Sequence, residues 1–225
     1  MKNFNQHKMF GIRWSAILIG ILFLAMKQEI QAQYISNNGA YVSVSSGTVV
    51  SMDNINNDNA TTLNNAGTII LNTLINAGAT QGNGTYNIKG NFTNTGTVAI
   101  GASAGTVNMI GTSAQIMAMS GVTSLYNLTI DNAIGVTLSS TQTIITNNLT
   151  INSGKIFKIE AAKNLTVTGV ISNYGGNAGF VLESTVSGTA SLIHNNVNVP
   201  ATVQRYISGN AEDWHFLASP VFNQV

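Results

Sequence analysis

Few side chains in this sequence are suited to acid–base chemistry, and the acidic ones are widely scattered. Glycoside hydrolysis needs two carboxyl groups on either side of the scissile bond. Asp131 and Glu183 are the only pair that neighbouring repeats could bring together. A solvated strand face explains the group of lysines around Glu160 better than a catalytic site does. The sequence therefore predicts no catalytic residues and no enzyme.

One Asn-rich segment, residues 53–59, places oxygen-bearing side chains at alternating positions. Because calcium prefers oxygen ligands, Asp53, Asn56 and Asp58 form a weak calcium candidate. The segment lacks the glycine and terminal glutamate of an EF-hand loop, and it lacks the glycine-rich phrase of calcium-binding β-rolls. An Asn-rich turn is the better interpretation, and we expect no metal and no other cofactor.

Trp214 and His215 are the residues that most resemble a ligand contact. Beside Asp213 they could form an aromatic, sugar-binding patch. The alternation from Trp214 to Ala218 favours another interpretation, in which Trp214 packs its ring inside a cap. A zinc site is not supported, since His194 and His215 have no cysteine and no third histidine to join them after Ala32.

The N-terminal segment, residues 1–32, has the layout of a signal peptide. Lys2, Lys8 and Arg13 precede an apolar stretch at 14–26, and a short polar segment ends at Ala32. The apolar stretch is shorter than the roughly 20 residues that a membrane-spanning helix needs. We therefore expect cleavage after Ala32, export to the medium or the outer cell surface, and no membrane span in the mature chain.

Removal of this leader changes the net charge. It holds four of the nine basic residues and one of the eight acidic ones, so the mature chain carries a net charge of −2. Such a surface lacks the lysines and arginines that bind a phosphate backbone, and nucleic acid is not an expected partner. The chain has no cysteine, so packing and backbone pairing must stabilise the exported fold.

Short strand patterns alternate with Gly- and Asn-rich turns from about position 34 to position 199. The phrase Asn-Leu-Thr-Ile/Val occurs at 127–130, 148–151 and 164–167, so that the second interval is shorter than the first. Within the second copy, Leu149 and Ile151 point to one face and Thr150 to the other, which is the period of a half-buried strand. Gly-Thr phrases mark further strands between positions 47 and 107.

Short strands at a repeat of roughly 20 residues predict an all-β fold with a solenoid architecture, in which each coil pairs with the next. We assign this parallel β-solenoid to residues 33–199. A β-sandwich is the alternative, because regularly spaced short strands also describe it. Stacked coils place Asn and Thr side chains above one another, where they can form hydrogen-bonded ladders. Such ladders explain the amide-rich surface without a ligand.

The composition changes after Pro200, where aromatic and charged residues become more frequent. We expect residues 200–225 to be a cap over the last coil or the beginning of a further β domain. We also expect the chain, which ends at Val225, to be an N-terminal fragment of a longer protein.

The Gly-Thr-Val and Asn-Leu-Thr-Ile phrases resemble large secreted surface proteins of the Bacteroidetes that are associated with type IX secretion. Residues 201–207 and 214–221 resemble an element that follows the repetitive β region in such proteins. The resemblance implies a non-enzymatic, adhesin-like structural protein at the cell surface. Surface glycans or other cell-surface components are its expected partners. The alternative function is a carbohydrate-binding or polysaccharide-processing β-helix module.

Overall fold

The structure is a computed structural model that describes residues 32–101, 103–142 and 144–209. The expected signal peptide lies outside these residues apart from Ala32, and so do Trp214 and His215.

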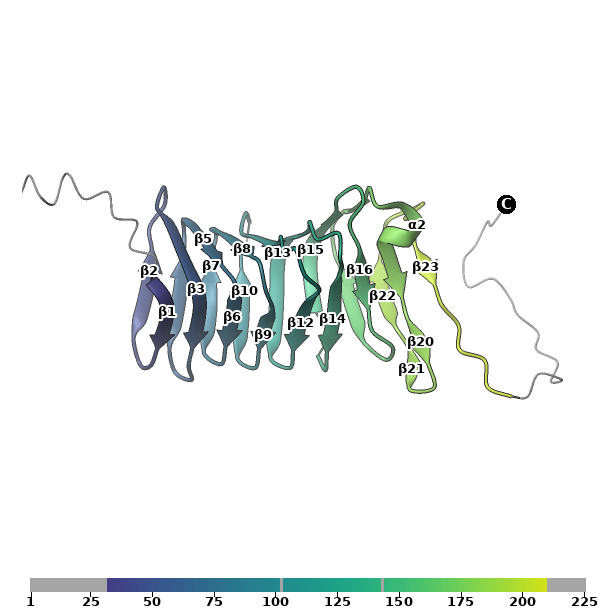
Figure 1. Cartoon of the computed structure of the whole chain (residues 1–225), viewed down its shortest axis with the longest axis horizontal. Coiled ribbons are helices and arrows are strands. Elements are labelled where there is room, and N and C mark those ends of the chain that lie inside the picture. The colour runs from purple at the N-terminus through teal and green to yellow at the C-terminus, as the bar shows by residue number, and fades with distance from the viewer. Residues whose placement is uncertain (1–31, 102, 143, 210–225) are drawn as a thin grey trace, which may run out of the picture. The chain divides into compact units, whose positions relative to one another are not determined.

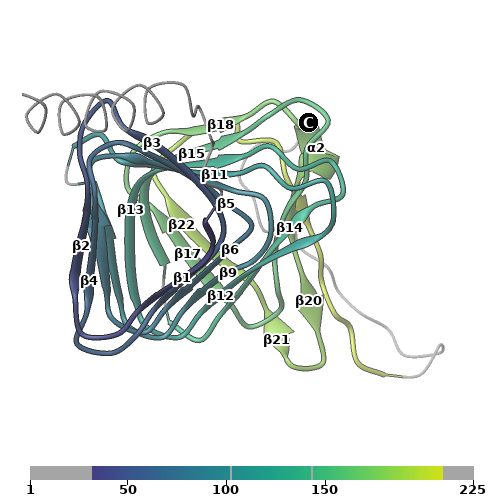
Figure 2. The same cartoon turned by 60° about the vertical axis from the view of Figure 1, so that its left-hand side comes forward.

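The described body is a parallel β-solenoid, which confirms the predicted fold class. Its coils lie side by side along a common axis (Figure 1). Seen closer to end-on, the chain turns repeatedly around one interior (Figure 2). Every pairing between coils is parallel, whereas β-sandwich sheets are antiparallel. The sandwich alternative is therefore excluded.

The strands form three stacks, and each coil contributes one strand or half-strand to each stack over most of the length. The first stack contains β1 (Ala32–Asn37), the second half of β3 (Val49–Asn57), β6 (Thr73–Asn76), β9 (Phe92–Asn94), β12 (Gln115–Met119), β14 (Val136–Ser140), β16 (Phe157–Ile159), β19 (Phe180–Leu182) and β23 (Thr202–Val203).

The second stack contains β2 (Tyr41–Val44), β4 (Thr62–Asn65), β7 (Ala79–Gly82), β10 (Thr97–Ile100), the first halves of β13 (Val122–Ile130) and β15 (Ile144–Ile151), β17 (Asn164–Val167) and β22 (Ser191–His194). The third stack contains the first half of β3, β5 (Thr68–Leu71), β8 (Thr85–Ile88), β11 (Thr106–Met109), the second halves of β13 and β15, and β18 (Ile171–Asn173).

Two elements interrupt the stacks near the C-terminal end. The short helix α2 (Gly176–Gly179) precedes β19, and an antiparallel hairpin of β20 (Ser184–Thr185) and β21 (Gly188–Thr189) separates β19 from β22. Beyond Pro200, β23 pairs parallel with β19. The ladder of the first stack therefore continues past the proline.

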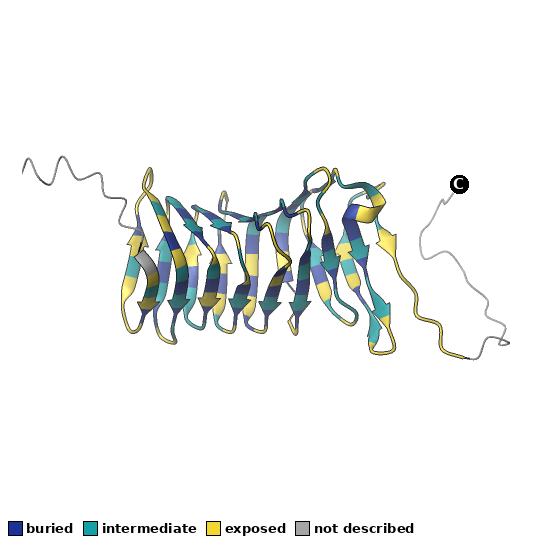
Figure 3. Cartoon of the chain, in the orientation of Figure 1, coloured by how far each residue is buried: buried dark blue, intermediate teal, exposed yellow. Residues whose placement is uncertain are grey.

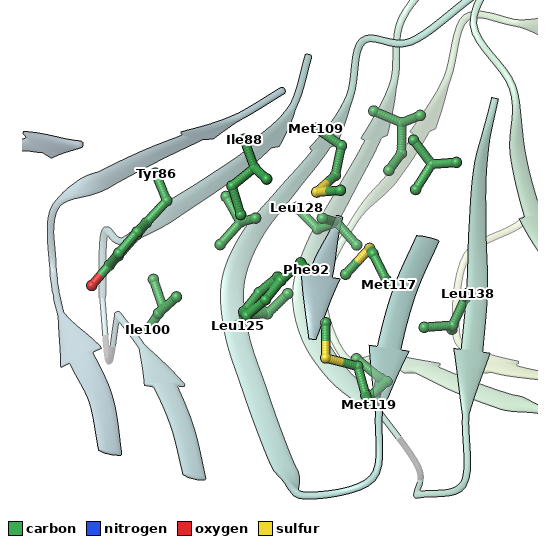
Figure 4. Close-up of a cluster of buried hydrophobic side chains, with 14 of the residues drawn as sticks. Tyr86, Ile88, Phe92, Ile100, Met109, Met117, Met119, Leu125, Leu128 and Leu138 are labelled. Carbon is green, nitrogen blue, oxygen red and sulfur yellow. The ribbon is translucent and has the colours of Figure 1, made fainter. Parts of the chain in front are cut away.

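The core is a continuous apolar column inside the coils. Strand residues alternate between buried and more exposed positions, as period-two geometry requires (Figure 3). Phe92 and Met117 from the first stack and Tyr86 and Leu128 from the third point into the same interior (Figure 4). Phe157 and Phe180 occupy paired positions on adjacent coils and stack with ring centroids 5.8 Å apart.

Coil length varies because the loops vary, not the strands. Leu74 pairs with Phe92, and Phe92 pairs in turn with Met117, so the coil after Phe92 is longer than the coil before it. The first two Asn-Leu-Thr phrases stack in register on the third stack, one complete coil apart. The third phrase lies in β17 on the second stack, paired with the strand at 144–146. Its shorter spacing from the second phrase therefore reflects a change of face, not a shorter coil.

Candidate functional site

The most organised polar feature of the molecule is a ladder of four buried asparagines at the ends of first-stack strands, here called the inner Asn ladder: Asn37, Asn57, Asn76 and Asn94. Each amide nitrogen donates to the amide oxygen of the next coil, at 2.7 Å from Asn37 to Asn57 and at 2.8 Å for the two later steps. The four side chains therefore form one hydrogen-bonded row along the axis.

Backbone and hydroxyl groups complete this ladder. The Asn57 amide also donates to the carbonyl oxygen of Ala79 at 2.9 Å, and its oxygen accepts from the Thr61 hydroxyl at 2.8 Å. The row ends at Asn94, whose amide donates to the Thr123 hydroxyl at 2.9 Å. Among the described residues, no buried side-chain nitrogen or oxygen lacks a hydrogen-bond partner. The interior of this part therefore offers no unpaired side-chain group that could recognise a ligand.

Shorter ladders lie on the outer surface of the third stack. Asn108 donates to Asn87 at 2.8 Å, and Asn148 donates to Asn127 at 3.0 Å. Asn127 in turn donates to the Thr106 hydroxyl at 3.3 Å. These half-buried amides donate to the preceding coil, so this surface is amide-rich for a structural reason.

The two acids considered as a catalytic pair lie apart. Asp131 follows the third-stack half of β13, and Glu183 follows β19 in the first stack. Each carboxylate pairs with its own lysine, Asp131 with Lys155 and Glu183 with Lys158, both at 3.1 Å. These partly exposed ion pairs are the kind that contribute little to stability. The structure does not assemble the two carboxylates into a hydrolytic site.

The calcium candidate is divided by a strand. Asp53 and Asp58 flank residues 54–57 of β3, so about 16 Å of extended chain separates their α carbons. The Asn56 amide donates to Asp58 at 2.9 Å, and the Asn72 amide donates to Asp53 at 3.3 Å. The structure therefore does not bring Asp53 and Asp58 to one ion. In the described ranges no three His, Cys, Asp or Glu side chains are grouped as metal ligands.

The aromatic side chains do not form a sugar-binding platform on the described surface. Phe92, Phe157, Phe180 and Tyr86 are fully buried. Burial raises the pKa of the Tyr86 hydroxyl well above its ordinary value, and this hydroxyl donates to the carbonyl oxygen of Gln81 at 3.2 Å. The exposed tyrosines are dispersed: Tyr34 and Tyr41 lie on different stacks of the first coil, Tyr174 follows β18, and Tyr206 follows β23.

Two cavities lie at the ends of the solenoid. One of about 200 Å³ lies at the N-terminal end, among the apolar side chains of the first coils. Another of about 420 Å³ lies at the C-terminal end, between the last strands of the first and second stacks. Both are openings of the core column, and neither contains a group of carboxylates.

The comparisons with known proteins found no relative. No protein-family model, no curated protein and no solved structure matches this chain. In the part of the chain that the structure describes, no helix has the length and apolar character needed to cross a membrane. Function is therefore inferred from the geometry of the described residues and from the sequence.

The inner Asn ladder was only partly predicted by sequence reasoning. Stacked amides were expected, but on the surface. The signal for buried ones is a repeated phrase, an apolar residue, any residue and then asparagine, at 35–37, 55–57, 74–76 and 92–94. An asparagine in phase with the apolar residue of a strand points to the same face, which here is the interior.

Proposed function

We propose that the mature chain is a non-enzymatic secreted or cell-surface protein that serves as a rigid structural and adhesive rod. The observation that carries this proposal is the use of Asn and Thr side chains as coil-to-coil ladders, inside and outside the solenoid. Groups that bond to the next coil stiffen the stack, and they are not free to bind a substrate. The signal-peptide pattern of residues 1–32 supports export.

The alternative, a carbohydrate-binding or polysaccharide-processing module, has less support. It needs aligned exposed aromatic side chains, or two carboxyl groups roughly 5–10 Å apart. The described residues place four aromatic rings in the core and pair Asp131 and Glu183 with separate lysines.

This proposal is tested by attachment assays that compare cells producing the protein with cells that lack it. We expect surface labelling by antibody on intact producing cells, and weaker attachment to glycan-coated or cell-coated surfaces when the protein is absent. The purified mature chain should release no reducing ends from polysaccharides. Unchanged attachment together with catalytic depolymerisation would replace the structural role with the enzymatic one.

A further inference from the structure

The last described coil leaves the apolar core open. In the second stack, Leu165 is fully buried, whereas Leu192, its partner on the next coil, is half-buried. In the first stack, Val203 pairs with Leu182 and is 41% exposed. The cavity of about 420 Å³ lies between these strands, and its apolar lining includes Leu182, Ala190 and Leu192. At this opening, apolar side chains of the last coil are exposed that a further coil would cover.

The strand edges at this end are also uncovered. Within residues 32–209, gaps excepted, β22 pairs with β17 and β23 pairs with β19. Each strand therefore has one edge of unpaired backbone groups among the described residues. Proteins cover such edges, because an open edge recruits other chains.

Chain order indicates which segment comes next. Along the solenoid, a second-stack strand follows each first-stack strand, as β17 follows β16 and β22 follows β19. The strand after β23 therefore belongs above β22, on the open edge. The link can be long, since a complete hairpin separates β19 from β22.

The sequence of residues 214–218 has the alternating pattern of a strand. Trp214, Phe216 and Ala218 alternate with His215 and Leu217, so that one face of an extended 214–218 segment carries two large rings. Two acids, Glu212 and Asp213, come just before it. The cavity lining includes the cationic side chain of Arg205, which complements this charge.

We propose that residues 214–218 add the next parallel strand to β22, with Trp214 and Phe216 inserted into the cavity between the first and second stacks. This segment acts as the cap of the solenoid. The inference does not depend on the proposed function.

Tryptophan fluorescence provides the first arm of the test. Trp214 is the only tryptophan after the leader, so its emission reports on this segment alone. In the mature chain, residues 33–225, we expect blue-shifted emission that acrylamide quenches weakly. The emission should shift to the red in urea together with the loss of strand circular dichroism. A water-like, freely quenched signal from the folded chain would overturn the proposal.

Cysteine pairing provides the second arm, in a chain that has no cysteine of its own. Ile193 points outward from β22 and is 59% exposed. With Trp214 above Leu192, His215 lies above Ile193, about 4.8 Å away between strands. That separation falls within the range of roughly 4.4–6.8 Å that a disulfide bridges. We expect the double variant Ile193→Cys/His215→Cys to form an intramolecular disulfide on mild oxidation, or Ile193→Cys/Leu217→Cys if the register differs by two positions.

The matched control is Ile145→Cys/His215→Cys. Ile145 lies in the same outward row, two coils further into the solenoid, and is 45% exposed. It should not cross-link with His215→Cys. Cross-linking of the control as readily as the test pairs, or none in either test pair of a folded chain, would contradict the proposal. A disulfide found only between two molecules would show that a second copy occupies this end instead.

Discussion

We expect the Gly96→Ala variant of the mature chain to lose about 3 kcal/mol or more in its free energy of unfolding. Gly96 lies at a corner between the first and second stacks. A Cβ atom there would contact the carbonyl oxygens of Gly78 and Ala77 in the preceding coil at closer than van der Waals distance. The backbone must shift to make room, which would weaken the 2.8 Å hydrogen bond from the Thr97 amide to the Gly78 carbonyl. Urea unfolding followed by far-ultraviolet circular dichroism measures the effect.

Gly154→Ala is the matched control. Gly154 has a φ of +69°, and an added Cβ would have no atom within 4 Å. The substitution should cost only about 1–2 kcal/mol, from the left-handed backbone conformation. If Gly96→Ala costs no more than Gly154→Ala, the close approach of coils at this corner is not what requires glycine.

The Asn76→Leu variant should lose about 3 kcal/mol, although leucine has the same branched arrangement of side-chain heavy atoms, because each buried polar group left without a partner costs about 1–3 kcal/mol. The Asn76 oxygen accepts from Asn57 and from the Thr80 hydroxyl, and its nitrogen donates to Asn94 and to the Thr97 carbonyl. All these partners are in the fully or partly buried interior. Urea unfolding of the mature chain measures the loss.

Asn108→Leu serves as the control, because Asn108 makes the same type of amide contact to Asn87 on the outer surface. Water can replace that hydrogen bond, so the expected loss is below about 1 kcal/mol. Equal losses in the free energy of unfolding for the two variants would show that the inner Asn ladder stabilises the fold no more than the outer Asn contacts do.

The fold class could be predicted because its two determinants are visible in the sequence. Alternation of apolar and polar residues reports which face of a strand is buried, and the interval between repeated phrases reports the length of a coil. The sequence alone could not show which of the three stacks each strand belongs to. The copies of Asn-Leu-Thr at 148 and 164 look equivalent in sequence, yet they lie on different stacks. Face is set by the position of each corner, and the corners here are formed by loops of variable length.

The candidate sites show the same limit. Asp53 and Asp58 are close in sequence, but an extended strand holds them apart. Asp131 and Glu183 could be considered for one site because the sequence does not show the coil boundaries. In the structure they pair with separate lysines. A corner glycine such as Gly96, in contrast, is required by contact with the preceding coil, which no local pattern reports.

The central claim is that the protein is a rod built of stacked, interchangeable coils. Duplication of one coil is the most direct test of this claim. Residues 127–147 form one complete turn, because Asn127 pairs with Asn148 at the same position of the next coil. Three extra copies inserted after position 147 should fold, keep the strand signal in circular dichroism and lengthen the particle by about 14 Å in small-angle scattering, at about 4.8 Å per coil. A variant that unfolds, or that keeps the maximum dimension of the wild type, would contradict the stacked-coil account.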